Sequence, residues 1–180
     1  RRLNFDETLQ FTKDLAADRN LFLVHPFDEP DVIAGQGTVA LEMLAQVEDL
    51  DVLVVPVGGG GLISGVANVV KALKPSVEVI GVQMERFRGA YAAFHDIDEE
   101  AVVHGSTVAE GIAVKVPGIL TTQLIKRYVD DMLLVSEQDV EQAIFDLIEI
   151  EKTVAEGAGA VGLAVVRKHK ARFQNRRVGL

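Results

Sequence analysis

The sequence predicts an α/β domain in which a parallel β-sheet is flanked by helices. Short, almost entirely apolar runs alternate along the chain with longer segments whose apolar residues recur at helical spacing. Strands that are apolar on both faces are typical of parallel sheets covered by helices on both sides. Hydrophobic residues make up 48% of the 180 residues and charged residues 25%, which favours a folded domain over a disordered chain.

The predicted elements follow one another with short connections. Asn4 and Glu7 have the spacing of a capping box, which starts a first helix that runs to Ala17. The predicted strands are 21–24, 52–57, 77–83 and 132–135, with a fifth that begins at 176–180. The later helices are 37–47, 62–74, 88–94, 121–129, 137–152 and 157–170. Segment 96–104 is expected to be irregular, and no linker or repeat divides residues 1–180 into separate domains.

Composition excludes several classes of function. The chain has no cysteine, which excludes disulfides, thiolate metal sites and a cysteine nucleophile, and favours a cytoplasmic location. A net charge of −9 argues against binding to nucleic acid through phosphate contacts. The longest uncharged apolar stretch, 52–70, is interrupted by its glycines, so we expect no membrane span.

The most informative motif is a run of four glycines between a strand and a helix. It consists of Gly58, Gly59, Gly60 and Gly61, and Leu62 opens the helix that follows. Each glycine costs roughly 0.5–1 kcal/mol relative to alanine, so such a run needs a reason in the backbone. Free N–H groups and the helix dipole favour an anion at such a turn, and ligands of parallel sheets bind beyond the carboxyl ends of the strands. We therefore predict that these five residues hold a phosphate.

The glycine run is also compatible with roles other than this one. A tight turn packed against a neighbouring helix would equally favour glycine. A Walker loop would place lysine and serine or threonine after its last glycine, and this sequence does not. A dinucleotide-binding domain is the main rival among phosphate folds, although Gly59-x-Gly61-x-x-Ser64 lacks the third glycine of that fingerprint. A phosphate-binding domain without catalytic activity is a further alternative.

The run VPVGGGGLISG at 55–65 resembles the phosphate-binding loop of threonine dehydratases, which are fold-type II enzymes that use pyridoxal 5'-phosphate (PLP). Four further segments are similar to that family and follow its order, namely 25–30, 34–38, 109–114 and 156–160. The resemblance covers essentially the whole chain. It implies the large, cofactor-binding domain of the tryptophan synthase β-like architecture.

The resemblance also implies an activity. The family eliminates the hydroxyl group of L-threonine, and of L-serine, to give 2-oxobutanoate or pyruvate and ammonia. We therefore expect a cytoplasmic lyase of amino-acid metabolism, in isoleucine biosynthesis or in serine and threonine catabolism, that forms a homo-oligomer, a dimer or a tetramer. Serine racemase, or another fold-type II enzyme, is the alternative, because these enzymes share the glycine loop.

Three further residues are assigned to the neighbourhood of the active site by the resemblance. Glu110 and Gly111 stand where related enzymes commonly have aspartate and glycine beside the active site, and a solvated loop carboxylate is the alternative for Glu110. Glu156 matches a glutamate that lies near the cofactor ring in the family. A carboxylate at the start of a helix is also stabilised by the helix dipole, which is the alternative for Glu156.

The resemblance also indicates what the chain lacks. In serine racemases a glutamate at the position of Glu85 binds a divalent cation together with a later aspartate, but here that later residue is Tyr91, so we expect no metal. None of the eight lysines has the serine-phenylalanine-lysine context of the Schiff-base lysine. No catalytic residue is therefore assigned in this chain. We expect the small domain with that lysine to lie outside residues 1–180, and the working polypeptide to continue past both ends.

Overall fold

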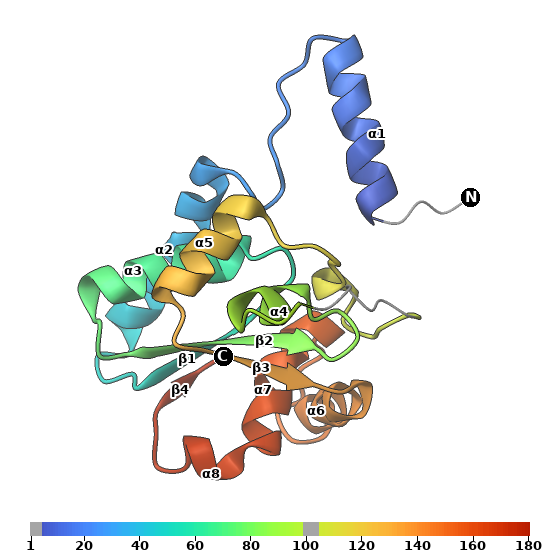
Figure 1. Ribbon diagram of the computed structural model, residues 1–180. Helices are drawn as coiled ribbons and strands as arrows, with labels where there is room; N and C mark the ends of the chain where they lie inside the picture. The colour runs from blue at the N-terminus through green and yellow to red at the C-terminus, as the bar shows by residue number, and fades with distance from the viewer. Residues whose placement is uncertain (1–4, 99–104) are drawn as a thin grey trace.

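The sheet of the computed structural model, which describes residues 5–98 and 105–180, has four strands in the order β3-β2-β1-β4 (Figure 1). All neighbouring strands are parallel: β1 (Val52–Pro56) pairs with β2 (Glu78–Met84) on one side and with β4 (Val178–Gly179) on the other. The outer strand β3 (Asp131–Val135) pairs with β2. The predicted parallel α/β sheet is confirmed.

Helices cover both faces of this sheet (Figure 1). On one face lie α2 (Pro30–Gln46), α3 (Gly61–Leu73), α4 (Gly89–Phe94) and α5 (Ile119–Tyr128). On the other face lie α6 (Glu137–Glu149), α7 (Gly157–Lys168) and α8 (Lys170–Phe173). A 3-10 turn, η1 (Glu110–Ile112), lies between α4 and α5 in the chain. Within the described residues, every helix is too short or too polar to cross a lipid bilayer.

The core is divided into two layers by the sheet. Alternate residues of β1 point to opposite faces, so Leu53 and Val55 join the cluster beneath α2 and α3, while Val52 and Val54 join the cluster beneath α7. Both faces of the strand are therefore buried. This is why its sequence is apolar at every position instead of alternating.

The first helix, α1 (Phe5–Asp18), lies away from the sheet and is joined to α2 by an extended segment (Figure 1). The predicted strand at 21–24 is wrong, because these residues pair with no strand among the described residues. Leu21 is 58% exposed and Phe22 86%, so the apolar run is not buried as a sheet strand would be. A strand requires a hydrogen-bonded neighbour, which local sequence does not encode. Asn4, the first residue of the predicted capping box, lies outside the described residues.

Helix α2 begins at Pro30, seven residues before its predicted start. Proline is favoured in the first turn of a helix, because its φ is already helical and its missing N–H would have no partner there. Gly35 and Gly37 both lie inside this helix. A Cβ on Gly37 would lie 2.9 Å from Val69 Cγ2, and one on Gly65 would lie 2.3 Å from the Ile33 carbonyl oxygen. These glycines let α2 and α3 pack backbone against backbone.

The remaining boundaries lie within a few residues of the predictions. Helix α6 ends at Glu149 instead of Lys152, which has a left-handed φ of 56°. Ser136 caps α6 as predicted, in a capping box with Asp139. The part of the predicted irregular segment that the structure describes, 96–98, is not helical, and the rest lies outside the described residues.

Candidate functional site

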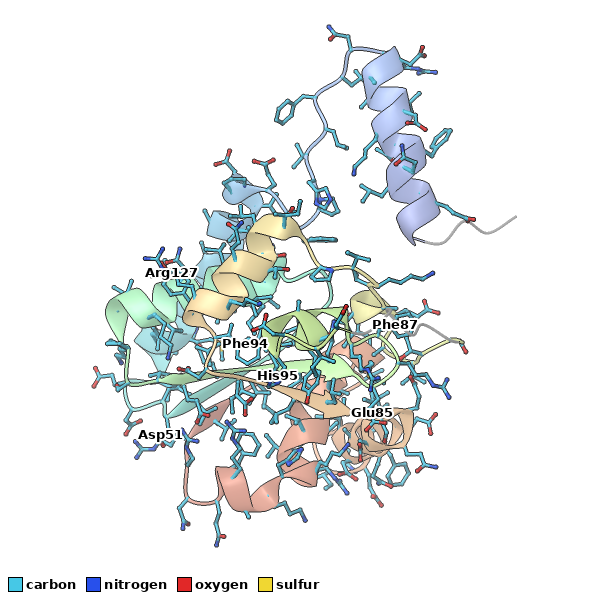
Figure 2. The ribbon with its side chains drawn as sticks, in the orientation of Figure 1. Asp51, Glu85, Phe87, Phe94, His95 and Arg127 are labelled. Carbon is cyan, nitrogen blue, oxygen red and sulfur yellow. The ribbon has the colours of Figure 1, made fainter. Side chains whose placement is uncertain are left out.

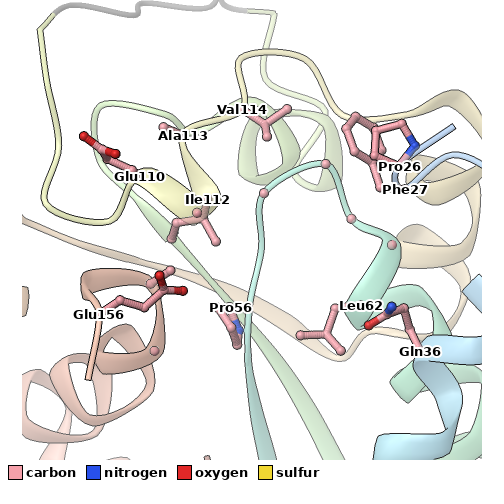
Figure 3. A pocket seen from close by; sticks show the side chains of 17 residues that line it. Pro26, Phe27, Gln36, Pro56, Leu62, Glu110, Ile112, Ala113, Val114 and Glu156 are labelled. Atoms are coloured by element: carbon pink, nitrogen blue, oxygen red, sulfur yellow. The ribbon is translucent and has the colours of Figure 1, made fainter. Parts of the chain in front are cut away.

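A cavity of about 510 Å³ opens at the carboxyl end of β1 (Figure 3). This is the edge at which parallel sheets bind ligands. All eight residues assigned from the sequence line it, namely Gly58, Gly59, Gly60, Gly61, Leu62, Glu110, Gly111 and Glu156. The lining is completed by Pro26, Phe27, Gln36, Pro56, Ile112, Ala113, Val114, Ala158 and Gly159.

The glycine loop turns directly into α3. Gly60 is the N-cap residue, with φ 97° and ψ −1°, and its carbonyl accepts a hydrogen bond from the Ser64 N–H at 3.0 Å. Among the described residues, no protein acceptor takes the backbone N–H groups of Gly59, Gly60, Gly61 or Leu62. No acidic residue occurs in the first turn of α3. The loop therefore offers unpaired donors and the positive end of a helix dipole to an anion.

Packing on the outer side of the loop explains why it must be glycine. A Cβ on Gly59 would lie 2.4 Å from ring carbons of Phe27, and one on Gly61 would lie 3.0 Å from Phe27 Cα. A Cβ on Gly60 would lie 2.9 Å from both Thr121 Cβ and Ile125 Cδ1. The alternative of a tightly packed turn is thus correct for this outer side. Within the part of the chain that the structure describes, the N–H groups on the inner side have no protein partner.

A second layer of residues fixes the loop from outside. The Asp28 carboxylate accepts hydrogen bonds from the N–H groups of Ile119, at 3.0 Å, and Thr121, at 3.1 Å, and so caps α5. Thr121 Oγ1 in turn donates to the Gly59 carbonyl at 2.7 Å. The sequence reasoning assigned no role to Phe27, Asp28 or Thr121. The sequence indicated only that Phe27 and Asp28 belong to segment 25–30, which is similar to the corresponding segment of threonine dehydratases. It indicated no physical role for either residue.

The opposite wall of the cavity is built from η1 and the first turn of α7. Glu156 is the N-cap residue of α7, and a Cβ on Gly111 would lie 3.4 Å from its Oε1 and 3.1 Å from Ala158 Cβ. The Glu156 carboxylate extends toward Ile112 and Pro56, whereas the Glu110 side chain extends away from the glycine loop (Figure 3). Both side chains are exposed. The two carboxylates therefore differ in direction, with only that of Glu156 extending toward β1.

The donor set fits a phosphate better than a metal ion. Four N–H groups at a helix start bind anions, and no lysine is found among the lining residues that the structure describes. Within residues 5–98 and 105–180, no group of three or more histidines, aspartates or glutamates is close enough to hold a metal. Glu85, the residue that raised the question of a metal, is labelled in Figure 2 and forms an ion pair with Lys168 Nζ at 3.1 Å.

The chain resembles proteins of known activity. It is 49% identical over 162 residues to an L-threonine ammonia-lyase of Thermotoga maritima, covering 90% of this chain and 40% of the relative. A crystal structure of a threonine deaminase from T.th. superposes with a TM-score of 0.88 at 34% identity, covering 99% of this chain and 59% of the other. Maize serine racemase superposes with a TM-score of 0.86 at 29% identity, covering 98% of this chain and 54% of the other.

This chain spans less than half the length of the curated relatives that it matches, between 40% and 48%. The comparisons confirm the resemblance to threonine dehydratases and serine racemases that the five motifs indicated. Residues 2–180 match the family described as pyridoxal-phosphate dependent enzymes, which also confirms the expected cofactor. Because this match extends over almost the whole sequence, the chain belongs to the pyridoxal-phosphate-dependent enzyme family.

Proposed function

We propose that the protein containing this chain is an L-threonine ammonia-lyase, and that this chain holds the phosphate of its PLP. One observation carries the proposal: unpaired N–H groups of the glycine loop line a cavity at the carboxyl edge of a parallel sheet. The identity of 49% to an L-threonine ammonia-lyase supports the choice of reaction. When bound, PLP supplies the electron sink for loss of the β-hydroxyl group.

In this proposal the residues of this chain bind the cofactor phosphate and orient the cofactor. Gly58, Gly59, Gly60 and Gly61, with Leu62, hold the phosphate dianion through their backbone and the dipole of α3. Phe27 packs against Gly59 and Gly61 and lines the cavity beside the loop.

The opposite wall borders the rest of the cofactor in this proposal. Glu156 lines this wall, and its carboxylate extends into the region between η1 and β1 (Figure 3). Gly111 allows η1 to pack directly on the first turn of α7, where Glu156 is the N-cap residue. Glu110 is exposed and lies at the rim of the cavity.

The proposal extends to the architecture of the protein. Residues 1–180 form the portion of the large domain that binds the cofactor phosphate, and the lysine that carries the cofactor belongs to a small domain outside this chain. Its partner is a small amino-acid substrate, and the protein works as a homo-oligomer in the cytoplasm, in isoleucine biosynthesis or in the catabolism of serine and threonine. The match covers only 40% of one relative and 48% of another, which supports a second domain in the longer protein.

Product analysis tests the proposed reaction. The purified natural protein that contains this chain, supplied with PLP and L-threonine, should release 2-oxobutanoate and ammonia in equal amounts. L-serine should give pyruvate and ammonia. A protein that binds PLP but converts neither amino acid to a keto acid would contradict the proposed reaction and leave the phosphate site standing.

Serine racemase is the second candidate, because maize serine racemase matches 98% of this chain with a TM-score of 0.86. The two candidates differ in the product formed from L-serine. Chiral chromatography of the reaction mixture separates them: D-serine as the main product favours the racemase, and pyruvate without D-serine favours the ammonia-lyase.

A further inference from the structure

The peptide group between Gly59 and Gly60 is held from outside the cavity. Its carbonyl oxygen accepts two hydrogen bonds, from Thr121 Oγ1 at 2.7 Å and from the Gly118 N–H at 3.2 Å. Both donors belong to the start of α5. In a trans peptide the C=O and the N–H point in opposite directions, and no cis peptide bond occurs among the described residues. The Gly60 N–H is therefore directed away from α5, to the open side of the loop.

This peptide needs an external restraint because glycine flanks it on both sides. Without a Cβ on either residue, the peptide plane has access to conformations that other residues cannot adopt. A flip of this plane would turn the Gly59 carbonyl oxygen toward the cavity and withdraw the N–H. A carbonyl oxygen facing a phosphate is repulsive, so the orientation of this one peptide changes the sign of its contribution to anion binding.

Thr121 is itself held at three atoms. Its N–H donates to the Asp28 carboxylate at 3.1 Å, its hydroxyl donates to Gly59, and its carbonyl accepts from Ser64 Oγ at 3.4 Å. The residue is fully buried, with 0% of its surface exposed. Ser64 belongs to α3, which follows the glycine loop directly. Thr121 thus joins the starts of α3 and α5 and has little freedom to redirect its hydroxyl.

We propose that Thr121 is a positioning residue that aims the Gly60 N–H at the cofactor phosphate by locking the Gly59–Gly60 peptide. The inference rests on the proposed function, since it assigns a role toward the phosphate of PLP. It requires no contact between Thr121 and the cofactor. Asp28 supports the same arrangement by capping α5, so the motif at 25–30 acquires a physical role.

The test compares Thr121→Val, which removes the hydroxyl and keeps the shape, with Thr121→Ser, which keeps the hydroxyl. The ¹⁵N-labelled natural protein that contains this chain, freed of cofactor, is titrated with inorganic phosphate and with PLP, and the affinity, the amide signals of 58–62 and the unfolding free energy are measured. In the wild type the Gly60 amide signal should move on saturation. Thr121→Val should bind both anions about tenfold more weakly and lose that movement, since one oriented hydrogen bond to an anion is removed.

Thr121→Ser should bind within about threefold of the wild type, because the orienting hydroxyl is retained. A merely structural role of Thr121 would lower the unfolding free energy without changing the affinity or the Gly60 signal. Thr121→Ser compared with Thr121→Ala isolates the hydroxyl a second time, so the result does not depend on the folding of the valine variant.

Two outcomes would overturn the inference in distinguishable ways. If Thr121→Val, or Thr121→Ala relative to Thr121→Ser, keeps the wild-type affinity and the Gly60 movement, Thr121 does not position the peptide, and the phosphate site itself stands. If neither anion moves any amide of 58–62 in the wild type, the proposed phosphate site is wrong and the inference fails with it.

Discussion

Gly60 has a backbone conformation that other residues adopt only with strain. Its φ is 97°, and a Cβ would lie 2.9 Å from Thr121 Cβ and Ile125 Cδ1. Gly60→Ala should therefore lower the unfolding free energy by roughly 1–3 kcal/mol. Gly35→Ala is the matched control, since Gly35 lies inside α2 and no atom lies within 4 Å of its added Cβ. It should raise the unfolding free energy by roughly 0.5–1 kcal/mol.

Urea denaturation of both variants checks this pair of expectations. Equal effects of the two substitutions would contradict them, because the difference depends on the backbone of Gly60 and on what lies beside it. Gly60 is consequently a poor position for testing ligand binding. Any side chain there combines a loss of stability with a change at the site.

Leu62 offers a cleaner test of the phosphate site. It lies in the first turn of α3, is half-buried and lines the cavity. Leu62→Glu places a negative charge beside the proposed phosphate. Repulsion between the carboxylate and the phosphate should weaken PLP binding by at least about tenfold. The helix dipole favours an acid at this position, so the fold should remain stable.

Leu62→Gln is the control, because it has nearly the same shape as glutamate without the charge. It should bind PLP within about threefold of the wild type. A fluorescence titration with PLP measures the affinity of both variants. If the two variants bind equally well, the phosphate does not lie beside the start of α3.

The sequence predicted the glycine loop and the two glutamates at the site but missed Thr121, Asp28 and Phe27. The glycines are consecutive, so their chemistry is visible as a local pattern. Asp28 and Thr121 are 93 residues apart and come together only through the fold. No local pattern indicates that a threonine hydroxyl reaches a glycine carbonyl from another helix.

At the scale of elements, α8 is held to the amino-terminal edge of the sheet by ion pairs. Arg172 bonds to Glu78 at the start of β2 and to Asp131 at the start of β3, and Arg176 also bonds to Glu78. Burial alone would raise the pKa of Glu78. Hydrogen bonds from Arg172 and Arg176, and their positive charges, outweigh it and hold the pKa of Glu78 below its ordinary value.

A pKa that is lower in the folded state stabilises the fold above the ordinary glutamate pKa of about 4.3. This stabilisation is lost as the pH falls below that value and the folded-state carboxylate is protonated. Glu78→Gln should lower the unfolding free energy by about 1 kcal/mol at pH 7, and the difference from the wild type should shrink below about pH 4. Urea denaturation of both proteins at several pH values measures this difference in unfolding free energy.

A double-mutant cycle with Arg172→Met isolates the ion pair from other effects of the substitution. The coupling energy should be present at neutral pH and should decrease at acid pH, as the Glu78 carboxylate becomes protonated. A coupling energy that is the same at both pH values would contradict the ion-pair explanation.

The strands that the sequence predicted well are those that are buried on both faces of the sheet. Strands β1, β2 and β3 were found within a residue or two because burial on both faces leaves a continuous apolar run. Segment 21–24 has the same local composition, yet it forms no strand. Helix α2 was predicted to start at 37 and begins at Pro30, and its close packing against α3 at Gly37 and Gly65 is not visible in the local sequence.

At the scale of the whole molecule, the parallel topology gathers the site at one edge. The segment before α2, the loop after β1, η1 and the start of α7 are far apart in sequence and all line one cavity. The carboxyl edge could be predicted from the alternation of strands and helices, because that alternation makes the sheet parallel. The shape of the cavity could not, because η1 and the start of α7 meet through packing that no local pattern shows.

The most direct test of the phosphate site is a crystal structure of the natural protein with PLP bound. The phosphate oxygens should lie about 2.9 Å from backbone nitrogens of the glycine loop, among them Gly60 N. The Gly59 carbonyl should remain bonded to Thr121. A phosphate bound elsewhere, or held by side chains with the glycine N–H groups left unpaired, would contradict the central claim that this loop is the cofactor-phosphate site.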